Sequence, residues 1–295
     1  MSIDFKKLNF FFILGNPRSG TSLLRLMLNT NNDISVPPEC GFYHWLSNKY
    51  KTQDFSDTAL FIESYIEDLK KSKKMETWDI DFNYLRHLIK KTKPATYEQV
   101  SLLVYLTYAA KFNKSPKTIG DKNNYYINYL CDLNKINKNP KYIYIVRDCR
   151  DVVCSYRALK KIETKSIYKP NLPWDIKNIC FSWNKNNINV INFFNKLPKN
   201  QYYIIRFEDL IEHTEKILKN ICNFLETNYD NNMMEYYKEN AQKNIEPIET
   251  LDWKKETLNK PNINKIGTYK HNLTMTQIKI IEKVSGEIMK QFHYL

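Results

Sequence analysis

Short apolar runs and amphipathic segments alternate along this chain. Residues 10–14 contain no polar side chain and are followed by Gly15, and apolar residues then recur at helical spacing at positions 23, 24, 27 and 28. An uninterrupted apolar run rich in aromatic and β-branched residues predicts a buried strand, and a 3.6-residue period predicts a helix. The first 30 residues are therefore expected to form a strand, a loop and a helix.

The same order recurs three times further along the chain. Strands are predicted in "KTIGDK", "KYIYIVRD" and "QYYIIRFEDL", with ends near Gly120, Val146 and Ile205, and apolar-periodic segments follow at residues 126–133, 152–159 and 217–225. Strands that are apolar on both faces and alternate with helices are typical of a buried parallel sheet with right-handed crossovers. The pattern predicts an α/β fold with three layers and a central, mainly parallel sheet.

Longer segments with a helical period lie between the predicted strands, at residues 55–71, 82–91, 100–112 and 174–194. We expect additional covering helices over the carboxyl edge of the sheet, mainly within residues 40–115. A chain of 295 residues that is 42% apolar can bury one sizeable core. The composition shows no linker or repeat, so residues 1–295 are predicted to form a single domain.

The formal charge of +13 suggests an anionic partner, such as a nucleotide, a nucleic acid, an anionic lipid or a sulfated or phosphorylated substrate. The alternative is that the charge belongs to solvated surfaces, because the lysines are dispersed in short runs such as "KKSKK". The apolar run at the N-terminus is short, and no window approaches the roughly 18 uncharged residues of a membrane helix. We expect a cytoplasmic protein without a membrane span.

Cations follow the predicted strands at equivalent positions. In a parallel sheet, ligands bind outside the carboxyl ends of the strands. Arg206 has an alternative role there, as an ion-pair partner of Glu208 or Asp209. One cation at such an edge means little, whereas four point to an anionic ligand: Arg18, Lys122, Arg147 and Arg206.

The segment "GNPRSGTS" at residues 15–22 has the outline of a phosphate-binding P-loop. Its backbone N–H groups and the N-terminus of the next helix can face an anion, and Thr21 and Ser22 add hydroxyl donors. Thr21 occupies the position of the lysine that a nucleoside triphosphate requires, and Arg147 precedes Asp148 where a magnesium ligand would be expected. The sequence thus favours a phosphate compensated by arginine and lysine, with no metal.

These segments and the terminal "IGTYKHNLTMTQIKIIEKV" together resemble the sulfotransferases that use 3′-phosphoadenosine 5′-phosphosulfate (PAPS). The resemblance is strongest to the branch that contains many bacterial enzymes and the tyrosyl-protein sulfotransferases, and it spans nearly the whole chain. It implies a three-layer P-loop fold and transfer of a sulfuryl group to a hydroxyl or amine. The acceptor stays open among small molecules, carbohydrates, lipids and peptides, and no specific nucleic-acid partner is implied.

The resemblance also implies two phosphate sites. Arg147 and Ser155 would bind the 3′-phosphate, with Lys265 as a further candidate in the terminal segment. The structural alternative is that Asp148 and Asp151 cap a helix and Arg147 neutralises them. The first loop would hold the 5′-phosphosulfate through Arg18, Ser19, Gly20, Thr21 and Ser22.

The general base is the least determined part of the site. The cytosolic branch carries Lys-Thr-His where this chain has residues 122–124 as Lys-Asn-Asn, so that histidine is missing. Spacing in the tyrosyl-protein branch implies Glu39, which follows two prolines that restrict the backbone. His44 is the second candidate, and Glu39 as a simple helix-start charge is the structural alternative. Arg18 and Lys122 would stabilise charge on the sulfuryl oxygens and the leaving phosphate.

Two other classes of function are compatible with parts of this pattern. A magnesium-dependent P-loop kinase would use the same loop, although Thr21 and the absence of an acidic metal ligand disfavour it. A basic protein that binds nucleic acid or an anionic surface would account for the charge and the many tyrosines.

Overall fold

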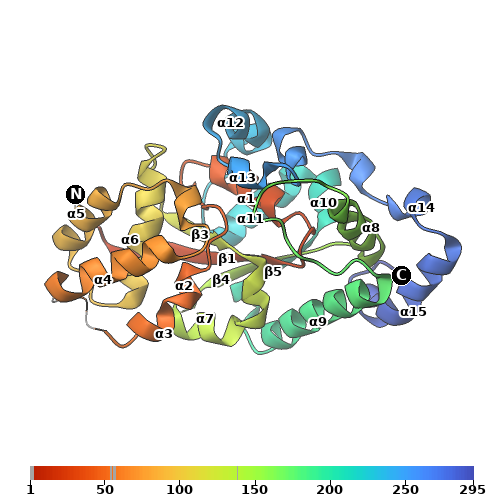
Figure 1. Ribbon diagram of the computed structural model, residues 1–295, viewed down its shortest axis with the longest axis horizontal. Helices are drawn as coiled ribbons and strands as arrows, with labels where there is room; N and C mark the ends of the chain where they lie inside the picture. The colour runs from red at the N-terminus through yellow and green to blue at the C-terminus, as the bar shows by residue number, and fades with distance from the viewer. Residues whose placement is uncertain (1–2, 54, 56–57, 138) are drawn as a thin grey trace.

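The computed structural model describes residues 3–53, 55, 58–137 and 139–295. Its described residues contain one sheet of five strands, and every strand pair is parallel (Figure 1). The prediction of a mainly parallel α/β sheet is therefore confirmed. The strand order is β2-β3-β1-β4-β5, with β1 at Asn9–Gly15, β2 at Ile34–Ser35, β3 at Thr118–Lys122, β4 at Lys141–Val146 and β5 at Tyr202–Arg206.

Two details of the sheet differ from the sequence prediction. Strand β2 was not predicted, because its two residues are too short to show a period, yet Ile34 pairs with Thr118 at the sheet edge. Strand β3 continues to Lys122, two residues beyond the expected end at Gly120. Gly120 is required inside this strand, because a Cβ atom there would lie 2.4 Å from the ring of Phe11 on the neighbouring strand.

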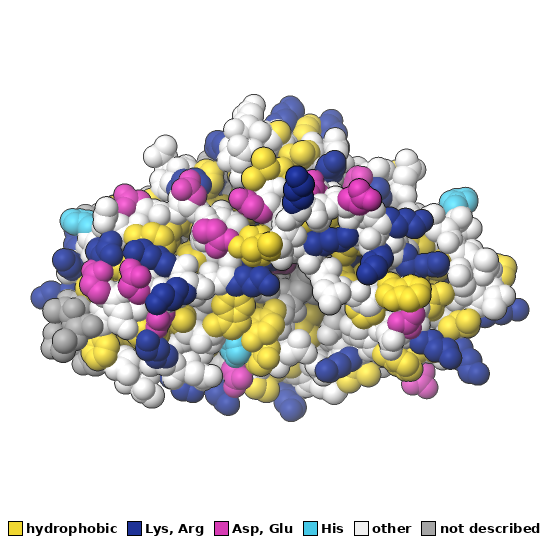
Figure 2. Space-filling view, in the orientation of Figure 1, with side chains coloured by type: hydrophobic (Ala, Val, Ile, Leu, Met, Phe, Trp, Pro, Cys, Tyr) yellow, Lys and Arg dark blue, Asp and Glu magenta, His cyan; other side chains and the backbone are white. Residues whose placement is uncertain are grey.

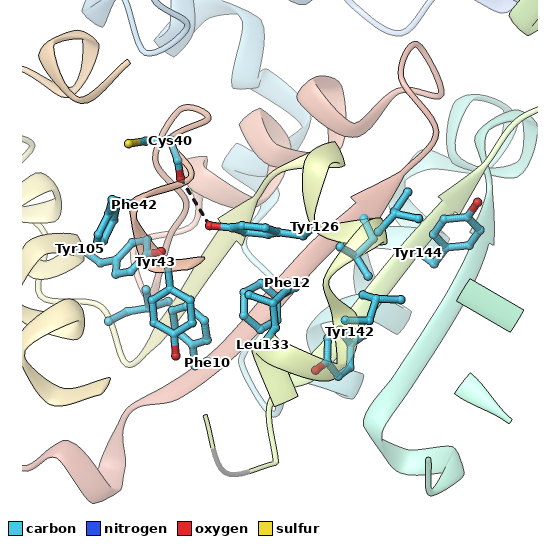
Figure 3. Packing of buried hydrophobic residues seen from close by; sticks show 14 of the residues in the cluster. Phe10, Phe12, Cys40, Phe42, Tyr43, Tyr105, Tyr126, Leu133, Tyr142 and Tyr144 are labelled. Atoms are coloured by element: carbon cyan, nitrogen blue, oxygen red, sulfur yellow. Dashed lines mark hydrogen bonds between the residues drawn. The ribbon is translucent and has the colours of Figure 1, made fainter. Parts of the chain in front are cut away.

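Side chains of β1 alternate between the two faces of the sheet, as a strand dictates. On one face Phe10 and Phe12 pack among buried tyrosines (Figure 3); the ring centroids of Phe10 and Tyr43 are 5.2 Å apart and those of Phe12 and Tyr142 are 5.5 Å apart. Helices that bury residues on this face are α2 (Phe42–Trp45), α3 (Ser47–Tyr50), α4 (Thr58–Lys71), α5 (Phe82–Thr92), α6 (Tyr97–Ala110), α7 (Leu130–Ile136), α8 (Cys149–Lys160), α9 (Ile176–Phe194) and α15 (Met275–Gln291).

The opposite face of the sheet carries Phe11 and Ile13 in a second core cluster. The sheet is thus the middle of three layers. Helices that bury residues on this side are α1 (Thr21–Thr30), α10 (Phe207–Glu212), α11 (Thr214–Leu225) and α12 (Tyr236–Lys243), and the short α13 (Ile248–Leu251) and α14 (Tyr269–Asn272) follow α12 in the chain.

The helices within residues 40–115 do not lie where the sequence analysis placed them. Helices α4, α5 and α6 gather at one end of the molecule in Figure 1 and bury their apolar side chains in the cluster that contains Phe10. Among the described residues of this span, Lys74 alone lines the cavity at the strand ends. That cavity is covered instead by the end of α8 with the loop at residues 161–170, and by residues 250–273, where loops alternate with helices of at most four residues that are too short to show a period.

Among the described residues, none of the helices combines the length and the apolar composition of a membrane span.

Candidate active site

A cavity of about 740 Å³ lies at the carboxyl ends of the central strands. Arg18, Lys122 and Arg147, which follow or end β1, β3 and β4, all line it. Figure 2 shows a hollow near the middle of this face with lysine and arginine side chains around it. The fourth strand-end cation, Arg206, is not in the lining; it lies 4.0 Å from Glu208 and its guanidinium stacks over the ring of Tyr294 at 4.5 Å. Arg206 is therefore a structural partner of Glu208, which was the alternative to a ligand-binding role.

The phosphate-type loop leads directly into α1. Gly20 precedes the helix with φ of +95°, and a Cβ atom there would lie 2.5 Å from the Phe207 ring, so only glycine fits. No described side chain caps the first turn of α1. Its N–H groups and the positive end of the helix dipole are therefore available to an anion beside Thr21 and Ser22, which line the cavity.

Arg18 connects the loop to the opposite walls of the cavity. Its Nε donates to the Ser155 hydroxyl over 3.1 Å, and its Nη1 donates to the Trp253 carbonyl over 2.8 Å. Burial, reinforced by the nearby charge of Arg147, lowers the pKa of Arg18 to about 10. An anion beside Arg18 would offset this destabilisation of the charged guanidinium, so Arg18 is well placed to bind one.

Arg147 lies behind Arg18. Its Nη1 donates to the Arg18 carbonyl over 3.1 Å and its Nη2 to the Lys265 carbonyl over 2.6 Å. Its guanidinium stacks on the Phe207 ring at 4.4 Å, while Nε has no partner among the described residues. Burial lowers the pKa of Arg147 despite the surrounding carboxylates. A buried, partly unsatisfied guanidinium fits a phosphate ligand, because such groups are rarely left without an acceptor.

The other residues of the predicted phosphate sites do not all line the cavity. Ser155 lines the cavity and accepts the bond from Arg18, whereas Ser19 is buried outside the lining, with a hydroxyl that has no described partner. Lys265 lines the cavity, but its ammonium lies 3.1 Å from Glu256. The structure therefore brings Arg18, Arg147, Ser155 and Lys265 together, with Ser19 beneath the loop.

Asp151 holds the terminal loop against α8, which the sequence analysis did not foresee. Its carboxylate accepts bonds from the backbone N–H groups of Gly267 and Tyr269, at 2.8 and 3.0 Å, and from the hydroxyl of Thr268 at 2.8 Å. Asp148 has the predicted capping role, since it accepts from the N–H of Arg150 at 2.8 Å. Asp151 thus fixes the segment that carries Lys265, and no local pattern signals a contact 116 residues away.

Glu39 lies in the same cavity with both carboxylate oxygens engaged. The ammonium of Lys122 contacts Oε1, and that of Lys74 contacts Oε2 at 2.9 Å. Burial opposes the ionised form, but Lys122, Lys74 and Lys254 outweigh it and hold the pKa of Glu39 well below its ordinary value. The segment that carries Glu39 is also held by a hydrogen bond, because the indole N–H of Trp78 donates to the Pro38 carbonyl over 3.0 Å.

Lys122 joins Glu39 to the phosphate-type loop. Its ammonium also lies 3.4 Å from the Ser22 hydroxyl, and only 2% of its side chain is exposed. Burial is the main reason that the pKa of Lys122 falls to about 8, with Glu39 opposing the shift. A buried ammonium between a carboxylate and this loop could exchange the carboxylate for an anion held at the loop.

His44, the second candidate base, lies outside the cavity lining. Its Nδ1 is 3.2 Å from the hydroxyl of Tyr125, its ring centroid is 4.3 Å from that of Tyr129, and its Nε2 is 3.8 Å from Asp132. Burial lowers the pKa of His44. These contacts place it in an aromatic cluster behind the Glu39 loop.

A sulfotransferase family model matches residues 11–231 of this chain. The chain belongs to the sulfotransferase family. The predicted resemblance is thereby confirmed. A candidate protein-tyrosine sulfotransferase of Caenorhabditis briggsae is 22% identical over 239 residues, which cover 77% of this chain and 69% of that protein.

Two solved structures share the fold of this family member. The sulfotransferase domain of the curacin biosynthetic pathway has a TM-score of 0.59 at 20% identity, and covers 94% of this chain and 96% of its own. The sulfotransferase domain of the Synechococcus PCC 7002 olefin synthase has a TM-score of 0.60 at 18% identity, with 96% and 97% covered. At this identity the likeness establishes the fold.

The described residues contain no group of three or more His, Cys, Asp or Glu side chains arranged to hold a metal ion.

Proposed function

We propose that this family member transfers a sulfuryl group from PAPS to a hydroxyl or amine of an acceptor. The observation that carries the proposal is the convergence of Arg18, Lys122 and Arg147 on one cavity beside the N-terminus of α1, which no described side chain caps. Such a site can compensate two separated phosphate groups without a metal.

The two ends of the donor would bind to different parts of the cavity. Gly20, Thr21 and Ser22 would hold the 5′-phosphosulfate at the start of α1, and Arg147 and Ser155 would hold the 3′-phosphate. The Nε of Arg147, which has no partner in the part of the chain that the structure describes, supports this division, because a phosphate oxygen would supply its missing acceptor. Arg18 belongs to the first of these parts and donates to the hydroxyl of Ser155 in the second, so it would lie between the two groups.

Glu39 would accept the proton of the acceptor. Its pKa lies well below the ordinary value, so it is ionised at neutral pH but a weak base while the lysines hold it; loss of a lysine contact would raise that pKa and make it a better base. One of its oxygens must first be released, and Lys122 can release it by turning to the anionic donor. Lys122 and Arg18 would then stabilise the charge that develops on the sulfuryl oxygens and on the leaving phosphate during in-line transfer.

Thermal stabilisation distinguishes this function from its rivals, because a ligand that binds only the folded protein raises the melting temperature. Adenosine 3′,5′-bisphosphate should raise it more than magnesium-ATP, and a chelator should not change the result. Tighter binding of magnesium-ATP would support a P-loop kinase, and stabilisation by oligonucleotides alone would support a nucleic-acid-binding protein.

The acceptor is best sought with labelled PAPS and a panel of phenols, sugars, lipids and peptides. Tyrosine peptides belong in the panel because of the name of the Caenorhabditis briggsae relative. Transfer that depends on Glu39 would define the acceptor class.

A further inference from the structure

The charges of three lysines from distant parts of the chain act on Glu39. Lys122 and Lys74 bond its two carboxylate oxygens directly. Lys254 lines the same cavity, and its charge helps to hold Glu39 ionised. Glu39 therefore has a third cation nearby that its own bonds do not account for.

Lys254 is held by a different carboxylate. Its Nζ lies 2.5 Å from Oε1 of Glu246, and only 12% of its side chain is exposed. Glu246 is itself 1% exposed, and its Oε1 also accepts from the hydroxyl of Thr250 at 2.7 Å. Burial would disfavour the ionised form, but Lys254 and Arg25 lower the pKa of Glu246 to about 2. Glu246 is thus a permanently charged anchor beneath the cavity wall.

Arg25 is the other partner of this anchor. Its Nη2 lies 2.8 Å from Oε2 of Glu246, and its Nη1 donates to the Val36 carbonyl over 3.1 Å. Arg25 belongs to α1, the helix that begins at the phosphate-type loop, and Val36 lies three residues before Glu39. The buried pair therefore connects the loop, the base and the cavity wall. A buried ion pair is weak evidence for a stabilising role, because its desolvation cost can exceed its attraction.

We propose that Lys254 is a positioning residue of the transfer centre, aimed by the Arg25–Glu246 pair and acting on Glu39 and Lys122 through its charge. The proposal rests on the proposed function, because it assumes that an anionic donor binds beside Lys122. Lys122 leaves Glu39 when it turns to that donor, and Lys254 together with Lys74 then keeps the carboxylate ionised. Lys254 also repels the ammonium of Lys122, which lowers the pKa of Lys122 before an anion binds.

Proton uptake on ligand binding tests this arrangement without a known acceptor. The probe is adenosine 3′,5′-bisphosphate, titrated by calorimetry in two buffers of different ionisation heat between pH 7 and 9.5. The phosphates of the probe are fully ionised in most of this range. The pKa of Lys122 is about 8 in the free protein, and an adjacent anion raises it, so the wild type should take up protons around pH 8.

Lys254→Gln should move this window to higher pH by roughly one unit, because loss of a nearby cation raises the pKa of Lys122 before the ligand arrives. The charged groups that face Lys122 and Glu39 in both proteins are Lys74, Glu246 and Asp121. Lys254→Arg keeps the charge and should restore the window. The glutamine can still donate to Glu246, whose pair with Arg25 persists, so a melting curve should show a folded variant.

Lys255→Gln is the matched control, since it removes the same charge from the adjacent residue of the same cavity lining. It should leave the window near pH 8. Equal shifts in the two glutamine variants, or no shift in Lys254→Gln, would overturn the positioning role. Failure of the wild type to bind the bisphosphate at all is a separate result, and it would refute the proposed donor instead.

Discussion

Arg147 supports Arg18 from behind: its Nη1 donates to the Arg18 carbonyl over 3.1 Å, while Nη2 reaches the Lys265 carbonyl over 2.6 Å. Arg18 has φ of +70°, a conformation that non-glycine residues rarely adopt. One buried guanidinium thus holds the strained residue of the loop and the terminal segment at a fixed separation. The proposed phosphate sites at the two ends of the donor depend on this separation.

Arg147→Ala should weaken the binding of adenosine 3′,5′-bisphosphate by about 1.5–3 kcal/mol, the usual value of a bond that involves a charged group. Calorimetry measures the affinity and a melting curve measures the stability. Arg206→Ala is the control, because Arg206 also ends a strand but lies outside the cavity lining. Unchanged affinity in the Arg147 variant would place the 3′-phosphate elsewhere.

Glu39→Gln preserves the shape of the side chain and removes its basicity. Turnover should fall by about 10²–10⁴-fold, the usual contribution of a general base, while donor affinity changes little. His44→Gln should cost much less, because His44 lies in the aromatic cluster with Tyr125 and Tyr129. Once an acceptor is known, near-normal turnover in Glu39→Gln with loss of turnover in His44→Gln would reverse the assignment.

Asp151→Ala should release the loop at residues 265–269 from α8 and reduce bisphosphate affinity. Two backbone N–H groups and one hydroxyl lose a charged acceptor, each bond of this kind being worth about 1.5–3 kcal/mol before the loop relaxes. Hydrogen exchange at Gly267 and Tyr269 measures the release. Asp175→Ala removes a carboxylate that caps α9, and it should lower stability without affecting this loop. Unaltered exchange in the Asp151 variant would show that other contacts hold the loop.

Asp121 predicts a specific dependence of stability on pH. Burial is the main reason that its pKa rises from 3.8 to about 7, and its Oδ2 accepts bonds from the hydroxyls of Tyr105 and Tyr126 at 2.6 and 2.7 Å. The folded protein therefore binds a proton here that the unfolded chain has lost. The stabilising contribution of this group should be complete below about pH 4 and should decline as the pH rises through about 7.

The difference in melting temperature between the wild type and Asp121→Asn, measured from pH 4 to 7.5, isolates this contribution from other titrating groups. The asparagine has no carboxyl group that ionises in the buried site, so the variant should lose less stability as the pH rises over that range. Parallel pH profiles for the two proteins would contradict the shift.

The sequence predicted the parts of the site that lie on regular elements. Arg18, Lys122 and Arg147 were placed together because apolar runs identified their strands, and parallel strands share one edge. Strand β2 was missed because two residues carry no period. Lys74 and Lys254 were missed for a different reason. Lys74 bonds Glu39 and Lys254 lines the same cavity, and each lies outside a strand or α-helix, where no periodicity fixes the direction of a side chain.

The bonds of Arg18 to Trp253, of Arg147 to Lys265 and of Asp151 to Gly267 have a consequence for the timing of synthesis. Each joins a residue that precedes β5 to a segment that follows all five strands in the sequence. Domains form from the N-terminal end as the chain emerges. The sheet can therefore assemble on the ribosome before this wall of the cavity exists, and a nascent chain should acquire the proposed nucleotide affinity only after residues 253–269 have emerged.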